Sequence, residues 1–295
     1  MKVRNMRRIF LSFSLAGLIV FFVPATAWAA TLVPLGTAGN YAVLASATVT
    51  NTGPSWITGQ VGLSPGTSVT GFPPGTSGHQ DIANAAAILA KTDLTAAYNN
   101  AAGQTPFITL SGDLAGRTLV AGTYRSTGGL TGTLVLDGGG VTTGVWIFQM
   151  PSTLVTASSS RVTLINGAQP CDVFWQVGSS ATLGAATTFV GNILANTSIT
   201  MITGATLLGR ALAGAVAPSG AVTLDTNRII QPAGCGYAAP AFVPPPAGSA
   251  LPPSLGIPIE LQGQFPWLVL IAIGAGLGAT ALGVGNRRRR RQRTA

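Results

Sequence analysis

Residues 181–213, ATLGAATTFVGNILANTSITMITGATLLGRALA, match themselves when the sequence is shifted by 18 residues. The aligned segments are Ala181-Thr182-Leu183 with Ile199-Thr200-Met201, Thr188-Phe189-Val190-Gly191 with Thr206-Leu207-Leu208-Gly209, and Ile193-Leu194-Ala195 with Ala211-Leu212-Ala213. A fixed period of this length is typical of a solenoid, in which each repeat forms one coil and coils stack on one another. The repeat therefore predicts stacked β-coils.

Each coil carries three short apolar segments. Thr182-Leu183 and Thr188-Phe189 lie six residues apart, and Ile193-Leu194 follows five residues later. This spacing divides a coil into three sides, as in a triangular β-helix. Side chains alternate along a strand, so we expect the leucine and phenylalanine to point inward and the threonines outward. Equivalent residues of stacked coils lie about 4.8 Å apart, which predicts an outward ladder of threonines.

One segment departs from the β pattern. Residues 79–102 lack Gly and Pro and are rich in Ala. Apolar residues recur there at helical spacing, which predicts one helix over about residues 79–102: Ile82, Ala86, Leu89 or Ala90, Leu94, Ala97 and Tyr98. Asp81 suits the first turn and Gly103 the end. We expect this helix to lie on the third, threonine-poor side, in a solenoid that it interrupts in sequence.

The two ends of the chain predict export and anchoring. Residues 1–30 combine basic residues, an apolar run and the cleavage site Ala27-Trp28-Ala29, as a signal peptide does. Residues 265–285 form an uncharged apolar stretch long enough to cross a bilayer. Residues 286–295 add a basic tail that is expected to stay in the cytoplasm. The predicted location is the cell surface, with the exported domain at residues 31–237 and a Pro-rich stalk at residues 238–264.

A second form of anchoring is also considered. Leu251-Pro252-Pro253-Ser254-Leu255 resembles a degraded sortase sorting signal in which Thr and Gly are replaced. We favour a membrane anchor over covalent wall attachment, and processing by a sortase stays open.

The charge distribution argues against a nucleic-acid partner. Ten of the 16 Lys and Arg residues lie in the signal and the tail, and six remain against all seven acids. The part expected to be exported is thus close to neutral, so the high isoelectric point comes from the basic residues of the predicted signal and tail.

The exported domain offers a disulfide but no catalytic constellation. Cys171 and Cys235 are expected to pair in an oxidising compartment, with free buried thiols as the alternative. His79 is the only histidine and is expected to cap the helix or lie on the surface. No metal-ligand cluster, nucleophile with a base, or phosphate loop is present, so we expect no enzyme activity and no cofactor or metal.

Seven stretches of the domain resemble the ice-binding-like (DUF3494) family: Gly39-Asn40-Tyr41-Ala42-Val43-Leu44-Ala45, Gly71-Phe72-Pro73-Pro74-Gly75, Asp93-Leu94-Thr95-Ala96-Ala97-Tyr98, Val145-Trp146-Ile147-Phe148-Gln149, Val190-Gly191-Asn192-Ile193-Leu194-Ala195, Gly209-Arg210-Ala211-Leu212-Ala213 and Ala221-Val222-Thr223-Leu224-Asp225. The resemblance covers about residues 35–230. It implies a discontinuous right-handed β-solenoid of triangular cross-section with one flanking helix. It also implies adsorption to ice by one flat face, and Thr203-Gly204-Ala205-Thr206 fits a motif that ice-active members carry there.

The functional hypothesis is an ice-binding, antifreeze-like surface protein that inhibits ice growth or recrystallisation. A flat face with ranked hydroxyl and methyl groups can hold ordered water, although exposed Thr also reflects strand propensity. The candidate ice-binding residues are Thr163, Thr182, Thr188, Ser198, Thr200, Thr203, Thr206 and Thr223. The partners of such a protein would be ice or an ordered water surface, and the membrane through the apolar segment near the C-terminus. The alternative is a non-catalytic adhesion or envelope-structural module that binds glycan or an envelope protein.

Overall fold

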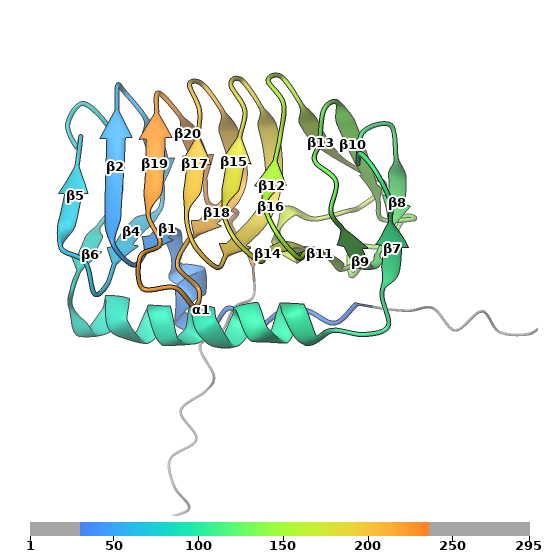
Figure 1. The fold of residues 1–295 in the computed structure, drawn as a ribbon, viewed down its shortest axis with the longest axis horizontal. Coiled ribbons are helices and arrows are strands. Elements are labelled where there is room, and N and C mark those ends of the chain that lie inside the picture. Colours follow the sequence, from blue (N-terminus) through green and yellow to red (C-terminus); the bar gives the residue numbers. More distant parts are fainter. Residues whose placement is uncertain (1–29, 236–295) are drawn as a thin grey trace, which may run out of the picture. The chain divides into compact units, whose positions relative to one another are not determined.

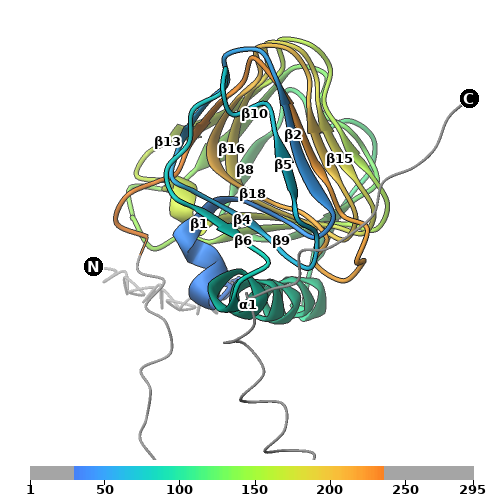
Figure 2. The same ribbon diagram turned by 90° about the vertical axis from the view of Figure 1, so that its left-hand side faces the viewer.

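The structure, a computed structural model, describes residues 30–235, in which the strands pair in parallel and enclose a core on three sides (Figures 1 and 2). Viewed along the stack in Figure 2, the coils have a triangular outline, with α1 (Ala85–Gly103) below one side. Residues 30–235 are thus mostly β, with the parallel sheets expected from the repeat and one α-helix.

The first side, called the threonine face, is the outward surface of a six-stranded sheet. In spatial order its strands are β12 (Leu154–Val155), β15 (Ala181–Leu183), β17 (Ile199–Met201), β19 (Val222–Asp225), β2 (Thr48–Thr52) and β5 (Ser68–Thr70).

The second side, called the arginine face, is the outward surface of five short strands and the first halves of two long ones. The short strands are β8 (Thr118–Val120), β10 (Thr133–Asp137), β13 (Arg161–Ile165), β20 (Arg228–Ile230) and β3 (Trp56–Thr58), and the long ones are β16 (Thr188–Ala195) and β18 (Thr206–Leu212).

The third side, called the helix face, contains the second halves of β16 and β18 and the strands beside them. These are β6 (Gln80–Ile82), β4 (Gln60–Leu63), β1 (Tyr41–Ala45), β14 (Val173–Val177), β11 (Trp146–Met150), β9 (Gly122–Ser126) and β7 (Ile108–Leu110). Two short 3₁₀ helices complete the fold, η1 (Gly36–Asn40) and η2 (Pro170–Asp172).

The order of coils in space differs from their order in the chain. The first strand, β1, pairs with β18 in the middle of the helix face, and the following coils stack away to β6. Helix α1 then runs along the stack to β7 at the other end, as Figure 1 shows. From β7 the coils return until β18 meets β1, where Val43 lies opposite Ala211. The helix therefore interrupts the solenoid in sequence, as predicted.

The 18-residue sequence offset equals the register of the strands. Ala181 lies opposite Ile199, and Thr188 lies opposite Thr206. The strand alternation is also confirmed, since Leu183 and Phe189 are fully buried.

Both long strands turn a corner at a glycine. β16 pairs with β13 at Thr188 but with β14 from Asn192, so it passes from the arginine face to the helix face between them. Gly191 lies at this corner with φ +112°, a conformation that side-chain-bearing residues rarely adopt. Its counterpart Gly209 has no room for a side chain, because a Cβ there would lie 1.9 Å from the carbonyl oxygen of Gly191.

Aromatic rings from β9, β11, β14 and β16 pack against one another in the core. Tyr124, Phe148, Trp175 and Phe189 pack in series, with ring centroids 5.6, 4.0 and 4.8 Å apart. The indole N–H of Trp175 donates to the carbonyl oxygen of Val190 at 3.0 Å, so its polar atom is satisfied inside the core.

Helix α1 begins at Ala85, so the prediction of a helix from residue 79 was wrong at its start. Gln80–Ile82 instead form β6, which pairs with β4, and the Asn84 side chain caps the helix by accepting from the N–H of Ala87 at 2.9 Å. Asp81 lies in this strand and accepts the hydroxyl proton of Tyr41 at 2.8 Å. The hydrogen bond from Asn84 and that from Tyr41 lower the pKa of the Asp81 carboxyl, although its burial opposes the shift.

The helix packs through small residues, as expected, but the buried stripe is shifted. Its buried residues are Ala87, Ala90, Leu94, Ala97, Tyr98 and Ala101. Ile82 and Ala86 are exposed, so their predicted place in this stripe was wrong, and of the alternatives Leu89 and Ala90 it is Ala90 that is buried. Ile82 lies in β6, before the helix, whereas Ala86 lies inside α1, one residue before the buried Ala87 and on the side turned to solvent. The helix contacts β1, β4, β6, β11, β14 and β16, which confirms that it lies on the threonine-poor side.

Lys91 ties the helix to the loop after β18. Its Nζ donates to the carbonyl oxygens of Ala213 and Gly214, both at 2.7 Å. Burial lowers the pKa of the Lys91 amine to about 7. The helix is therefore held by hydrogen bonds as well as by its apolar stripe.

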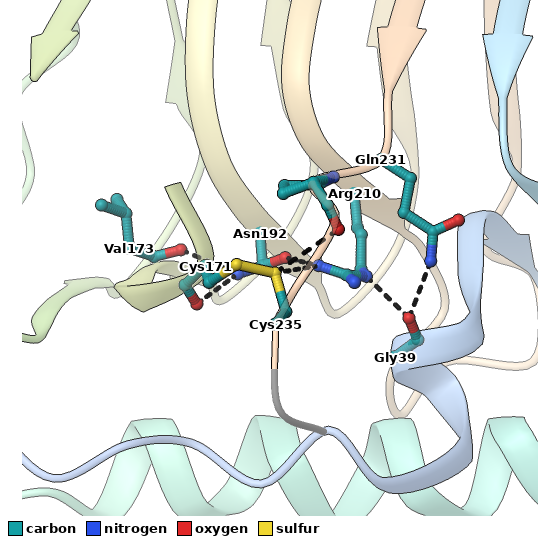
Figure 3. Close-up of a disulfide and its surroundings, with 8 residues drawn as sticks. Gly39, Cys171, Val173, Asn192, Arg210, Gln231 and Cys235 are labelled. Carbon is teal, nitrogen blue, oxygen red and sulfur yellow. Dashed lines mark hydrogen bonds between the residues drawn. A yellow bond between two sulfur atoms is a disulfide. The ribbon is translucent and has the colours of Figure 1, made fainter. Parts of the chain in front are cut away.

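A disulfide joins Cys171 to Cys235, as the sequence predicted. Figure 3 shows it beside Arg210, which is buried and donates to the carbonyl oxygen of Gly39 and to Oδ1 of Asn192, both at 2.9 Å. Asn192 in turn donates to the carbonyl oxygen of Val173 at 3.1 Å. This network links the first turn of the domain, the middle coils and the last described residues.

The predicted signal peptide, stalk, transmembrane helix and basic tail lie outside the described residues. Between residues 30 and 235 the structure contains no helix that is both long and apolar enough to cross a membrane.

Candidate functional site

A row of threonines crosses the threonine face in register. Thr182 lies opposite Thr200, Thr200 opposite Thr223, Thr223 opposite Thr50, and Thr50 opposite Thr70. Five adjacent strands thus present the same side chain, about 4.8 Å from one strand to the next. At the open end of the row Val155 lies opposite Thr182 and is 51% exposed.

A partial second row of small hydroxyl groups runs beside the first and is interrupted at β19, where Ala221 lies between Ser198 and Thr48. Ser198 precedes Thr200 by two residues, as Thr48 precedes Thr50 and Ser68 precedes Thr70. Residues two apart on a strand share a side and lie about 6.6 Å apart. The Oγ of Ser198 accepts from the N–H of Ala221 at 3.1 Å, so this hydroxyl is fixed in place.

The face is supported from below and has little charge. The residues between the two rows point inward and are buried: Val49, Ala181, Ile199 and Val222. Asp225 is the one ionisable side chain in the six strands. Its carboxylate accepts hydrogen bonds from the hydroxyls of Thr203 and Thr226. A rigid and almost uncharged array of methyl and hydroxyl groups results.

The eight predicted site residues do not lie on one face. Thr182, Ser198, Thr200 and Thr223 come together on the threonine face. Thr203 lies after β17, at the corner that leads to β18, and its hydroxyl is bound to Asp225.

Thr163, Thr188 and Thr206 lie on the arginine face instead. Thr188 and Thr206 are opposite each other, but Arg161 lies opposite Thr188 and Arg228 opposite Thr206. The expectation that Thr182 and Thr188 belong to one outward ladder was therefore wrong. The chain turns a corner between them, at residues 184–187.

Two residues of the threonine row, Thr50 and Thr70, were missed in the sequence. They lie before the helix, whereas the repeat was recognised only after it. A signal was present, because Thr48-Val49-Thr50 and Ser68-Val69-Thr70 have the same hydroxyl–apolar–threonine pattern as Ser198-Ile199-Thr200. The partner of Thr50 is Thr223, which is distant in sequence, so only the fold reveals the full row.

The chemistry available on this face is adsorption. Within residues 30–235 no group of three or more His, Cys, Asp or Glu side chains is placed to hold a metal ion. The His79 side chain is 71% exposed and lies 3.3 Å from the Asp81 carboxylate. Of the two roles expected for His79, helix cap or surface residue, the structure shows the second. The described part of the chain thus offers a patterned surface.

Parallel β-coils with a flanking helix and one in-register threonine surface define the class of protein as a β-solenoid. Residues 43–230 match the family model described as Ice-binding-like. The chain belongs to this ice-binding-like family, as its sequence stretches predicted.

Its relatives come from distant organisms. The chain is 49% identical over 206 residues to an ice-binding protein of Nostoc sp. (strain HG1), with 68% of this chain and 75% of the relative covered. It is 38% identical over 217 residues to an ice-binding protein of Flavobacterium frigoris (strain PS1), with 68% and 77% covered.

Solved structures share the fold. The crystal structure of an ice-binding protein from an Antarctic biological consortium superposes with a TM-score of 0.67 at 44% identity, covering 70% of this chain and 95% of that one. The ice-binding protein of the Antarctic ascomycete Antarctomyces psychrotrophicus gives a TM-score of 0.65 at 40% identity, covering 68% and 99%.

Proposed function

We propose that this protein binds ice through the threonine face and thereby inhibits ice growth or recrystallisation. The observation that carries the proposal is the in-register row of five threonines on adjacent strands. The family relationship supports the activity, and the row supports the choice of face.

The physical argument rests on the order and the low charge of this surface. Threonine methyl groups weaken the hold of the face on bulk water, while the hydroxyls offer fixed hydrogen-bond partners to a water lattice. Threonine has few χ1 rotamers on a strand, so little side-chain entropy is lost when the lattice forms. A charged side chain would instead keep its own hydration shell and disturb the lattice.

The arginine face is a poorer candidate for ice. Its Thr188–Thr206 pair is only two strands wide and is bounded by Arg161 and Arg228. A face that is interrupted by charged side chains cannot order water over several coils.

The experiment compares the same substitution on the two faces. A protein of residues 31–237 is frozen slowly into a growing ice ball, and its enrichment in ice is measured. This part of the chain contains the region that solved relatives match over 95% or more of their length. Thr200→Lys on the threonine face and Thr206→Lys on the arginine face both replace a half-buried threonine.

We expect the unchanged protein to be enriched in ice and Thr200→Lys to be excluded from it, because the lysine interrupts the row between Thr182 and Thr223. Thr206→Lys should remain enriched. Thermal unfolding of each variant shows whether the fold is kept. Exclusion of the folded unchanged protein would contradict ice binding, and loss of enrichment in Thr206→Lys alone would move the site to the arginine face.

We further propose that the domain acts at the cell surface without catalysis, held by the predicted apolar segment at residues 265–285. In this proposal the signal at residues 1–30 directs export. The coils wind right-handedly, as parallel crossovers almost always do.

Washing membranes with high salt tests the anchor. The full chain should stay in the membrane fraction and a chain that ends at residue 264 should be released, whereas release of both would exclude the anchor.

A further inference from the structure

We propose that the arginine face is a second binding surface, and that its ligand is an extended acidic polysaccharide of uronic-acid type. The proposal concerns a different surface from the threonine face and does not depend on ice binding.

The first observation is that the exposed arginines gather in one row. In register across the face run Thr133, Arg161, Thr188, Thr206, Arg228 and Trp56. Arg161 and Arg228 are exposed and lie three strands apart, which is about 14 Å. Thr188 and Thr206 occupy the same position on the two strands between them.

The second observation is that the other described arginines are occupied within the fold. Arg117 donates to the carbonyl oxygens of Asp113 and Ser111. Arg125 lies over the ring of Phe107 at 3.9 Å and donates to Gln149. Arg210 is buried in the network of Figure 3.

The guanidinium groups of the row are different. No carboxylate among the described residues lies within salt-bridge distance of Arg161 or Arg228. Asp137 is the only acid in the strands of this face, and it lies at the end of β10. Its carboxylate accepts from the N–H of Gly139 at 2.9 Å and from the Asn166 amide at 2.8 Å, which lower its pKa. The row is thus a positive track without its own counter-ions.

The third observation is an exposed aromatic ring at the end of the row. Trp56 is 52% exposed, and the guanidinium of Arg228 lies 4.9 Å from its ring centroid. The cation–π contact holds both side chains in place and leaves part of the indole open. Large exposed aromatic side chains beside arginine are typical of binding hot spots.

These three features together select the ligand chemistry. Guanidinium groups bind carboxylates, threonine hydroxyls bind sugar hydroxyls, and an indole ring packs on the apolar face of a sugar ring. The linear arrangement fits an extended chain. Only two cations are spread over about 14 Å, and this density suits a polymer with spaced carboxylates better than a nucleic acid, which binds to dense basic patches.

The test measures binding of the full-length chain, in detergent solution, to immobilised alginate by surface plasmon resonance. Dextran is the neutral comparison, and an oligothymidylate strand is the nucleic-acid comparison. We expect saturable binding to alginate that weakens with salt, and little binding to dextran or to the oligonucleotide.

The variants locate the site. Arg161→Gln with Arg228→Gln should raise the Kd for alginate roughly tenfold, because two exposed ion pairs are lost. Trp56→Ala should raise it by a similar factor, roughly tenfold. Arg117→Gln removes one positive charge outside the row, directly before β8, and should leave the Kd unchanged. Thr182→Tyr on the threonine face should also leave it unchanged, so a failure of ice binding and a failure of this proposal are separable.

The proposal is overturned by any of four results. These are absence of alginate binding, equal binding to dextran, binding to the oligonucleotide at least as tight as to alginate, or unchanged alginate binding in the double arginine variant. Arg161, Arg228 and Trp56 are exposed, and Arg117 and Thr182 are half-buried, so circular dichroism of each variant confirms the fold before binding is measured.

Discussion

The threonine face and the arginine face begin from the same repeat but become different surfaces. Each carries one threonine pair from the two matching repeats, Thr182 with Thr200 and Thr188 with Thr206. On the threonine face the neighbouring coils continue the row with Thr223. On the arginine face the neighbouring residues are charged. A local repeat therefore fixes the register of strands, but the surface property depends on coils that are distant in sequence.

The largest expected effect comes from removing the support that the two faces share. Trp175 is fully buried and packs against Phe148 and Phe189. Trp175→Ala should lower the free energy of unfolding by about 3–5 kcal/mol, because it leaves a cavity and an unpaired carbonyl. Denaturant unfolding measures the loss. Ice enrichment and alginate binding should then fail at the same temperature, and failure of one surface in a folded protein would show that the faces have separate supports.

A change of pH should separate stability from adsorption. Burial lowers the pKa of Lys91 from 10.5 to about 7 in the folded protein. Below pH 7 the amine is charged in both states, and burying this charge opposes folding. Between pH 7 and 10.5 the unfolded chain binds the proton more tightly, so stability rises with pH, by at most about 1.4 kcal/mol per unit.

This pH dependence is checked by denaturant unfolding at pH 7 and about pH 9, in the unchanged protein and in Lys91→Met. The variant should lose most of the slope. Ice enrichment of the folded protein should stay constant across the same window, because Asp225 is the one ionisable side chain in the strands of the threonine face. A parallel change in ice enrichment would mean that the helix face, and not the threonine face, determines adsorption.

The smallest expected effect is a gain. Val155 occupies the position next to Thr182 at the open end of the row. Val155→Thr extends the row by one strand with nearly the same volume, so ice enrichment should rise modestly and stability should change by less than about 1 kcal/mol, as for an exposed surface substitution. Ile165→Thr, an exposed β-branched residue on the arginine face, is the matched control and should leave ice enrichment unchanged. An equal gain in both variants would mean that threonine content matters and the row does not.

The sequence predicted the parts of the fold that local pattern determines. The offset between Ala181 and Ile199 gave the strand register, and the Ala-rich stretch gave the helix and the side on which it lies. The Cys171–Cys235 pairing, which was expected from the predicted export of two cysteines, is present.

The remaining features depend on pairing between distant segments. The helix start was misplaced because Gln80–Ile82 pair with β4, and no local feature of that segment excludes a helical turn. Thr50 was missed because its neighbour Thr223 is contributed by the other end of the chain. The six-residue spacing already divided the coil into sides, but the candidate site still grouped the two threonine pairs, because the sequence does not show which outward side continues as threonine in the neighbouring coils.

Because α1 runs along the stack, its length is related to the number of stacked coils. Its 19 residues extend about 28 Å at 1.5 Å per residue, which is about six of the eight strand spacings from β6 to β7, and residues 104–107 complete the path to β7. Neither end of the stack is an end of the chain, because the chain enters and leaves at the middle, where β1 meets β18. A further coil therefore cannot be appended at a terminus. It must be inserted next to the helix, which then needs about three more residues to reach the far end. The width of the threonine row and the length of the helix are therefore expected to change together among proteins built on this plan.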